Sequence, residues 1–565
     1  MNGNEPLLTY EQSRELDRKT MAAGWSSAQL MGQAALSSLY RLMQKPAPEE
    51  IVILCGPGNN GGDGLALAYH ILSSAAQGGF AANCRLTVVQ TTRAKSEASQ
   101  FYQSLLQDRL PVLSPDELLN ETPSPGWSQD RRGNLLIVEA LLGSGQDRPL
   151  EGMFRSLCEW ISDKQKEGAR VLSLDVPAGL LENQPFSDTA LFVPNEVHTY
   201  GPHRLPCALN VDLLSGAEIY SNPIGFFPEM ESVWTRARRD PARLKLFRRS
   251  VDSHKYSNGA GWILGGSSQM EGALLLSAGC FFASGGGILS CMSTSESPLY
   301  LSEASLMQKT EFAPDARTGA IVAGPGCSQE DALRYLKTLS SQVESSDAPK
   351  STTGSSVSEH GKPDMALILD AGVAVRSLEF PALHGTKTLL TPHPGEWKSM
   401  GGPPIQDVKS LQDSLEFAIE KVGSFVLYKG QCSVLLDPFA RKALLFPWPN
   451  PGLAVAGTGD CLTGILMTAL CRGAEMQEAV EASMELLHSA TERAIHPTSS
   501  RFPELIRRTL AYVSGNNQGK NKDAPDAIVE YEDDSEQPGT DAGMEIFATP
   551  GHSRKRSGEA RRGLL

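Results

Sequence analysis

A glycine-rich segment near the end of the chain, Gly457-Thr-Gly-Asp460, has a composition suited to chemistry on a phosphate group. Its glycines let the backbone turn tightly and bring N–H groups close to a ligand. The apolar residues 461–470 predict a helix, whose N-terminus would gather these N–H groups into an anion site. Asp460 would be a carboxylate beside that site, as suits a base that deprotonates a hydroxyl near a phosphate. Simple helix capping by Asp460 is the alternative interpretation.

A second glycine-rich segment, residues 56–64, follows the apolar run 51–55 in the first half of the chain. It could wrap a pyrophosphate, although it is neither G-x-G-x-x-G nor a P-loop, which disfavours a redox dinucleotide fold and an NTPase. Glu139 and Asp175 each follow a strand-like run, and parallel strands end at the same edge of a sheet. These carboxylates and the glycine segment therefore predict a site, although Asp63 could cap a helix and either carboxylate could belong to a turn.

Alternating patterns along the chain predict the elements that position these groups. Helix-like residues 10–43 precede the first strand, and the first half continues with strand-like residues 85–90, 135–138 and 170–176 and helix-like residues 65–74, 94–106 and 152–161. In the second half, strand-like residues 261–264 precede a helix at 271–283, and further strands are predicted at 320–323, 365–369, 388–390 and 425–428. This alternation predicts an α/β protein with two parallel sheets covered by helices.

The composition limits the possible partners. With 565 residues, 40% hydrophobic and 21% charged, the chain reads as a globular protein of two domains. A formal net charge of −14 argues against nucleic-acid binding. The ten cysteines form no Cys-x-x-Cys pair, and no apolar stretch is long enough to span a membrane, so we expect a cytoplasmic protein without a membrane partner.

Changes in pattern predict the domain boundaries. Residues 1–235 form the first domain, and the arginine-rich residues 236–258 are interpreted as a solvated linker. The second domain covers residues 259–515, with a Ser-, Thr- and Lys-rich insertion at 340–362 that is predicted to be disordered. The polar residues 516–565 are predicted to be a disordered tail.

Several motifs together resemble one known family, the bifunctional NAD(P)H-hydrate repair enzymes. The first half resembles their epimerase domain, which is Rossmann-like, in Asn59-Asn-Gly-Gly-Asp63, residues 139–145 and residues 173–179. The second half resembles their dehydratase domain in Gly324-Pro-Gly326, Thr391-Pro-His-Pro-Gly-Glu396, Lys429-Gly430 and Gly457-Thr-Gly-Asp460. The match covers about residues 10–515 in the family's domain order.

The resemblance implies two α/β domains, the second ribokinase-like, and two activities. Water added to the ring of NADH or NADPH gives a hydrate that exists as two epimers, R and S. The dehydratase would remove this water from the S epimer with ADP or ATP and Mg²⁺. The epimerase would interconvert the R and S epimers. Phosphoryl transfer to the ring hydroxyl would make it a better leaving group. A homo-oligomer is expected.

The resemblance also implies the site residues. Asp460 would be the dehydratase base and Asp175 the epimerase acid or base. The hydrate would contact Ala273, Gly326, His393 and Asp460, and the nucleotide would contact Lys429, Gly430, Gln431, Cys432, Ser433 and Gly459. The epimerase substrate would contact Asn59, Asn60, Gly61, Gly62, Asp63, Gly143, Ser144, Gly145 and Asp175, and K⁺ would bind Asn60 and Glu139.

The chain departs from the family pattern chiefly in its first half. Glu139 stands where the family has Asp, Ala178 where it has Ser, and His203 where it has Lys. The first two positions belong to the potassium site, so a weak or inactive epimerase is one interpretation. Two alternatives stay open: a second half that is a small-molecule kinase, such as one for a vitamin precursor, and a first half that binds nucleotide without catalysis.

Overall fold

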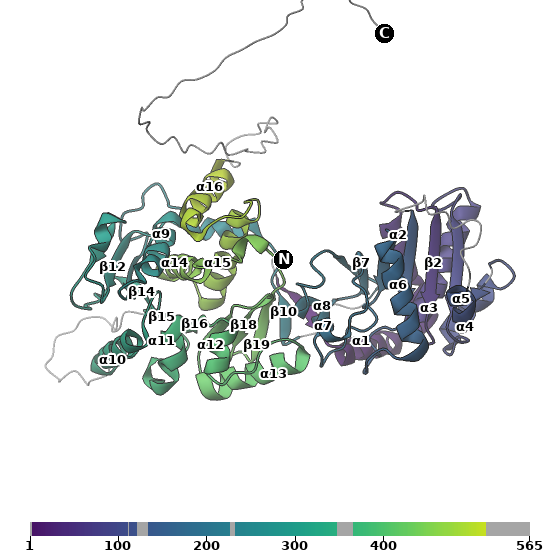
Figure 1. Cartoon of the computed structure of the whole chain (residues 1–565), viewed down its shortest axis with the longest axis horizontal. Helices are drawn as coiled ribbons and strands as arrows, with labels where there is room; N and C mark the ends of the chain where they lie inside the picture. The colour runs from purple at the N-terminus through teal and green to yellow at the C-terminus, as the bar shows by residue number, and fades with distance from the viewer. Residues whose placement is uncertain (1–2, 111, 121–133, 226–231, 347–364, 516–565) are drawn as a thin grey trace, which may run out of the picture. The chain divides into compact units, whose positions relative to one another are not determined.

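The computed structural model describes residues 3–110, 112–120, 134–225, 232–346 and 365–515 (Figure 1). Its first half contains a parallel sheet of seven described strands in the order β4-β3-β2-β5-β6-β7-β9. These are β2 (Glu50–Cys55), β3 (Arg85–Gln90), β4 (Val112–Leu113), β5 (Leu135–Ala140), β6 (Arg170–Leu174), β7 (Glu196–Tyr200) and β9 (Glu218–Asn222). The predicted parallel sheet is confirmed.

Alternate residues of β2 explain why helices cover both faces of this sheet. Ile51 and Ile53 pack with α2 (Ser27–Leu42), α3 (Asn59–Ala76) and α4 (Glu97–Leu106) on one side. Val52 and Leu54 pack with α5 (Pro115–Asn120) and α6 (Gly152–Lys166) on the other. Successive side chains of a strand point to opposite faces, so an uninterrupted apolar run is the pattern of a strand that is buried twice.

The second half is built around a twelve-stranded sheet in the order β13-β12-β11-β14-β15-β16-β17-β18-β19-β10-β1-β8 among the described residues. Its strands are β1 (Glu5–Leu8), β8 (His203–Arg204), β10 (Trp234–Arg236), β11 (Ala260–Leu264), β12 (Ile288–Met292), β13 (Leu306–Gln308), β14 (Thr318–Ala323), β15 (Ala366–Leu369), β16 (Thr388–Leu390), β17 (Phe425–Tyr428), β18 (Ser433–Asp437) and β19 (Lys442–Phe446). The strands from β13 to β17 are parallel, whereas β17, β18 and β19 are antiparallel.

Helices also cover both faces of the second sheet (Figure 1). One apolar cluster joins the sheet to α9 (Glu271–Ala283), α14 (Thr458–Cys471), α15 (Met476–Thr491) and α16 (Phe502–Gly515). Another joins it to α10 (Gln329–Ser346), α11 (Ala371–Arg376), α12 (Pro394–Ser399) and α13 (Val408–Phe417). Gly464 of α14 lies so close to α9 that an added Cβ would come within 2.0 Å of the Ser277 carbonyl oxygen, which fixes how α14 sits.

Three predictions about local structure are corrected. The helical residues 10–43 are two helices, α1 (Tyr10–Ala22) and α2, separated by a turn where Gly24 has φ +109°. The glycine segment 56–64 is mostly helical, because α3 begins at Asn59. The insertion expected at 340–362 begins later, since α10 continues to Ser346; residues 347–364 and the predicted disordered tail at 516–565 lie outside the described residues.

The arginine-rich segment 236–258 is not a solvated linker. Arg239 pairs with the buried carboxylate of Glu485 at 3.2 Å, and Arg243 pairs with Glu481 at 2.8 Å. Leu244 and Phe247 of this segment are buried in the apolar cluster that contains α15. The arginines therefore anchor the segment to α15 rather than to water. Among the described helices, none is both long and apolar enough to cross a membrane.

Candidate active sites

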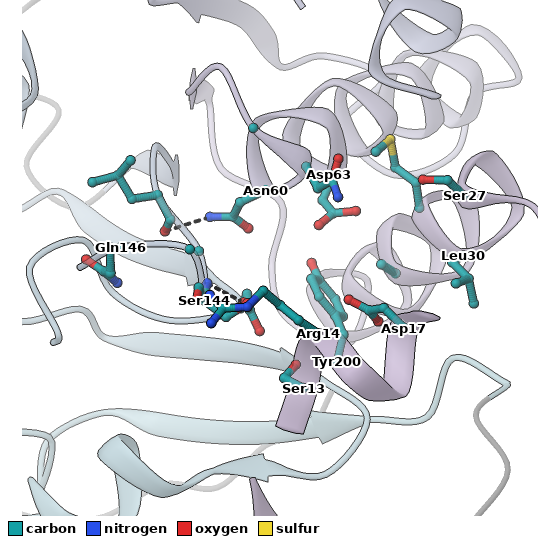
Figure 2. Close-up of a pocket in the computed structure, with 18 of the residues that line it drawn as sticks. Ser13, Arg14, Asp17, Ser27, Leu30, Asn60, Asp63, Ser144, Gln146 and Tyr200 are labelled. Atoms are coloured by element: carbon teal, nitrogen blue, oxygen red, sulfur yellow. Dashed lines mark hydrogen bonds between the residues drawn. The ribbon is translucent and has the colours of Figure 1, made fainter. Parts of the chain in front are cut away.

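A cavity of about 360 Å³ opens at the carboxyl ends of β2 and β5 (Figure 2). In the sheet, β3 lies on one side of β2 and β5 lies on the other, so the strand order reverses between β2 and β5. Ligands of open parallel sheets bind at such points. The predicted residues Asn59, Asn60, Asp63, Gly143, Ser144, Gly145 and Asp175 all line the cavity.

Gly61 and Gly62, which were predicted to contact substrate, are not among the lining residues. A Cβ at Gly61 would come within 1.9 Å of the Gly56 carbonyl oxygen, and one at Gly62 within 2.2 Å of Ser99 Oγ. Both glycines therefore let α3 pack closely against the turn after β2 and against α4.

Asp175 is held in an unusual backbone conformation at the floor of the cavity. Its φ is +61°, a left-handed value that is costly for a residue other than glycine and is common at functional sites. One carboxylate oxygen pairs with Arg204 at 2.8 Å, and the other accepts the Ser144 N–H at 3.1 Å. These contacts aim the carboxylate at the glycine turn after β5, as a catalytic acid or base requires.

Glu139 does not fit the role of potassium ligand that the resemblance implies. It is fully buried, and its two oxygens accept the backbone N–H groups of Leu141 at 2.8 Å and Ala178 at 3.1 Å. Burial raises the pKa of Glu139 to about 7, so the group is partly neutral near physiological pH.

The other two positions of the predicted potassium site, Asn60 and Ala178, supply few side-chain oxygens. Asn60 Oδ1 is buried without a partner while its Nδ2 donates to the Leu142 carbonyl at 3.0 Å, and Ala178 supplies no side-chain oxygen. Potassium is held by several oxygen atoms at once, and in the described part of the chain no three His, Cys, Asp or Glu side chains come together at a metal-binding spacing. Asn60 therefore offers one unpartnered oxygen at this position.

In the second half, Asp460 lies in the first turn of α14, as expected. Gly457 precedes this helix with φ +90°, and a Cβ there would come within 2.5 Å of Leu276. Among described backbone groups, the N–H groups of Gly459 and Asp460 have no partner, whereas the Thr458 N–H donates to Val455 at 3.4 Å. The amides left for an anion are thus those of Gly459 and Asp460, with that of Thr458 already engaged.

Charged groups surround Asp460. Burial raises its pKa to about 7, the negative charge of Asp370 adds to the rise, and Lys429 opposes it. Lys429 is largely buried and donates to Asp370 Oδ1 at 2.7 Å, and Thr391 donates to the same oxygen. A Cβ at Gly459 would lie 3.1 Å from Lys429 Nζ. The missing side chain thus lets Lys429 approach the first turn of α14 closely.

His393 has a structural task beside its predicted role. As N-cap of α12, its Nδ1 accepts the N–H groups of Gly395 at 3.0 Å and Glu396 at 3.2 Å. Because Nδ1 accepts, the proton sits on Nε2, which lies 3.2 Å from the carboxylate oxygen Oε1 of Glu396. Two other predicted residues come together: a Cβ at Gly326 would lie 3.1 Å from Ala273 Cβ.

The predicted nucleotide segment 430–433 covers the end of the turn between β17 and β18 and the first residue of β18, and its members differ in exposure. Gln431 is exposed, whereas Cys432 is 6% exposed and packs in the core between sheet and helices. Burial raises the pKa of the Cys432 thiol to about 12. Only the backbone of Cys432 is therefore placed to meet a ligand, and its side chain stabilises the fold.

Four ionisable groups at these sites were not predicted as site residues. Asp370 follows β15, so the strand-end rule applied to Glu139 and Asp175 would have found it. Asp17, Tyr200 and Arg204 line the first cavity from α1, β7 and β8, and nothing in their local sequence marks them.

A carboxylate of raised pKa at a helix N-terminus in the second half and a cavity lined by ionisable groups in the first half are the features of a two-site α/β enzyme that works by acid–base chemistry. Residues 27–201 match the family model described as YjeF-related protein N-terminus, and residues 262–506 match that of NAD(P)H-hydrate dehydratase. The chain belongs to the family of bifunctional NAD(P)H-hydrate repair enzymes.

Relatives carry the same two-domain description. A bifunctional NAD(P)H-hydrate repair enzyme of Thermofilum pendens is 28% identical, with 82% of this chain and 87% of the relative covered. One from Coxiella burnetii is 27% identical, with 88% and 96% covered. Among solved structures, an ADP/ATP-dependent NAD(P)H-hydrate dehydratase from Bacillus subtilis is 23% identical over 48% of this chain and 97% of its own, with a TM-score of 0.38.

Proposed function

We propose that this chain repairs hydrated NADH and NADPH. The second half dehydrates the S epimer with ADP or ATP, and the first half interconverts the R and S epimers. The observation that carries the dehydratase assignment is Asp460, a carboxylate with a pKa of about 7 beside unpaired helix amides and Lys429. The test is recovery of native NADH absorbance from a mixture of hydrate epimers, with and without nucleotide.

In this proposal Asp460 removes the proton of the ring hydroxyl as that oxygen accepts a phosphoryl group. The amides of Gly459 and Asp460 stabilise the charge on the phosphoryl oxygens, and Lys429 is held ready by Asp370 for the nucleotide phosphates. Mg²⁺ commonly binds one or two carboxylates together with substrate phosphates, and the carboxylates of Asp370 and Glu396 lie near enough to raise the pKa of Asp460. They are the residues that would hold it. The predicted cytoplasmic location and homo-oligomer stay predictions.

The kinase alternative has a distinct outcome, because a kinase would accumulate a phosphorylated product. A kinase would have no evident use for a fused epimerase-type domain, so the presence of this domain favours the repair reaction. For the first half, retention of hydrate without interconversion of its epimers would favour a binding module.

The pKa of Asp460 predicts how dehydration depends on pH. A base must be deprotonated, so kcat/KM should rise about tenfold per pH unit below a pH of about 7 and level off above it. Initial rates on the purified S epimer, at saturating nucleotide and constant ionic strength, measure this. A flat profile through this range would contradict the assignment of Asp460 as the base.

The contacts of Glu139 predict that epimerisation does not respond to potassium. Replacing K⁺ by Na⁺ or by an organic cation should leave the initial rate of epimer interconversion unchanged, because backbone amides already occupy the Glu139 oxygens. Melting temperature in the same salts gives a second readout, and it should be equal in all of them. A rate or melting temperature raised only by K⁺ would show that the ion binds despite these contacts.

A further inference from the structure

Asp17 of α1 lines the cavity of the first half. Within the described residues its carboxyl group makes no hydrogen bond and no ion pair. The basic residue one turn earlier, Arg14, is engaged elsewhere, with the Ser144 carbonyl and with Glu11, both at 2.9 Å. The carboxyl group of Asp17 is half-buried and lines the cavity without a partner in the described part of the chain, so it is available to a ligand there.

The groups that face Asp17 come from several elements. Burial raises its pKa to about 6, the charge of Asp175 adds to this, and Arg204 opposes it. Asp63 on α3 is pushed much further: burial raises its pKa well above the usual range, with smaller contributions from Asp175 and Asp17. Tyr200 on β7 is also buried, with a raised pKa. Burial thus favours the neutral forms of Asp63 and Tyr200, whereas Asp17, with a pKa of about 6, can exchange its proton near neutral pH.

The carboxyl groups of Asp17 and Asp175 reach the cavity from different elements, α1 and the turn after β6. Figure 2 draws Asp17 on one side and Ser144 on the other, and the Ser144 N–H holds Asp175. Inverting a carbon that bears a hydroxyl needs an acid to help the hydroxyl leave and a base to accept a proton when water returns on the other face. One carboxyl on each side of the ring meets that need.

We propose that Asp17 is a catalytic residue of the epimerase, acting as the acid–base partner of Asp175. The proposal rests on the proposed function of the first half. Protonated Asp17 gives its proton to the ring hydroxyl, whose C–O bond breaks with its electron pair going to oxygen, so that water leaves. The lone pair of the ring nitrogen forms a C=N bond, and the two carboxylates balance the cation.

Water then adds to the opposite face. Its oxygen bonds to carbon, the C=N electrons return to nitrogen, and its proton passes to Asp175, which leaves Asp17 ionised. The reverse reaction uses the two groups in exchanged roles. Both directions need one proton shared by the pair, and neither needs a co-reactant other than water. In heavy-oxygen water, inversion should therefore carry the isotope into the hydrate.

The test uses the full-length chain with Asp17→Asn, which keeps the shape and removes the acid. With nucleotide and Mg²⁺, the S epimer should be repaired at the wild-type rate, while R-to-S conversion and isotope uptake fall by about 100-fold or more. Asp17→Glu should recover part of the epimerisation. The control is Asp163→Asn, the same change at an exposed position of α6, which should leave both activities intact.

The pH profile separates catalysis from a structural role. In the wild type, kcat/KM for epimerisation should fall as pH rises above about 6, in parallel for both directions, and the Asp17→Asn variant should lack this decline. Wild-type epimerisation by Asp17→Asn would overturn the proposal. A loss of both activities with a lowered melting temperature, in Asn and Glu variants alike, would make Asp17 structural and also overturn it. If the wild type itself does not interconvert epimers, the proposed function of the first half fails.

Discussion

Asp460→Asn should fold normally and lose nucleotide-dependent dehydration by about three orders of magnitude, the usual range for removing a general base. The amide cannot take the hydroxyl proton, although it keeps the size of the side chain and leaves the α14 amides in place. The environment of Asp460 disfavours the charged carboxylate, as its pKa of about 7 shows. Replacing the carboxylate by a neutral amide should therefore not lower the melting temperature. Rates of NADH recovery from the S epimer measure the loss.

The fused first half supplies an internal control for this variant, because its epimer interconversion should stay at the wild-type rate. Asp252→Asn, the same change at an exposed position, should leave dehydration intact. Wild-type dehydration by Asp460→Asn would show that Asp460 only caps α14.

Asp175→Asn should abolish epimer interconversion and also destabilise the first half. Loss of an acid–base group should lower the rate by about 100-fold or more. The side chain of Arg204 is only 5% exposed. Leaving its buried charge without a partner should lower the free energy of unfolding by about 3 kcal/mol. The epimer ratio over time gives the rate, and denaturant unfolding gives the stability.

A matched variant separates the two effects of this change. Asp188→Asn alters an exposed carboxylate of α7 (Phe186–Thr189) and should change neither quantity. If Asp175→Asn keeps its stability but loses activity, the Arg204 pair contributes less than expected. Full activity with reduced stability would remove Asp175 from the mechanism.

The sequence predicted best those features that local pattern determines. The turn at Gly457–Asp460 was predictable because its glycines and the apolar run behind it lie together in the chain. The two parallel sheets were predictable because doubly buried strands read as uninterrupted apolar runs, as at Ile51–Cys55. The start of α3 was misplaced because Asn59–Gly64 is rich in residues that favour loops, while close packing against the turn after β2 requires its glycines inside the helix.

The electrostatic pairs of the sites could not be predicted, because they join distant parts of the chain. Lys429 and Asp370 are 59 positions apart, and their meeting depends on how the strands carrying them are ordered in the sheet. The substitution at Glu139 was visible in the sequence, but its consequence was not. Whether a longer carboxylate reaches an ion or the Ala178 amide depends on backbone positions that only the fold determines.

The N-terminal strand has a consequence for anyone who wishes to study the activities apart. Strand β1 pairs with β10, and β10 pairs in turn with β19, so residues 5–8 complete the sheet of the second half rather than that of the first. A truncated chain that ends at residue 235 would lack β19 and would carry Leu7 and Leu8, both fully buried in the intact chain, on strands without that neighbour. Unpaired strand edges of this kind pair with other copies of the chain. We therefore expect separate expression to give aggregates, and inactivating substitutions in the intact polypeptide to be the better route to each reaction.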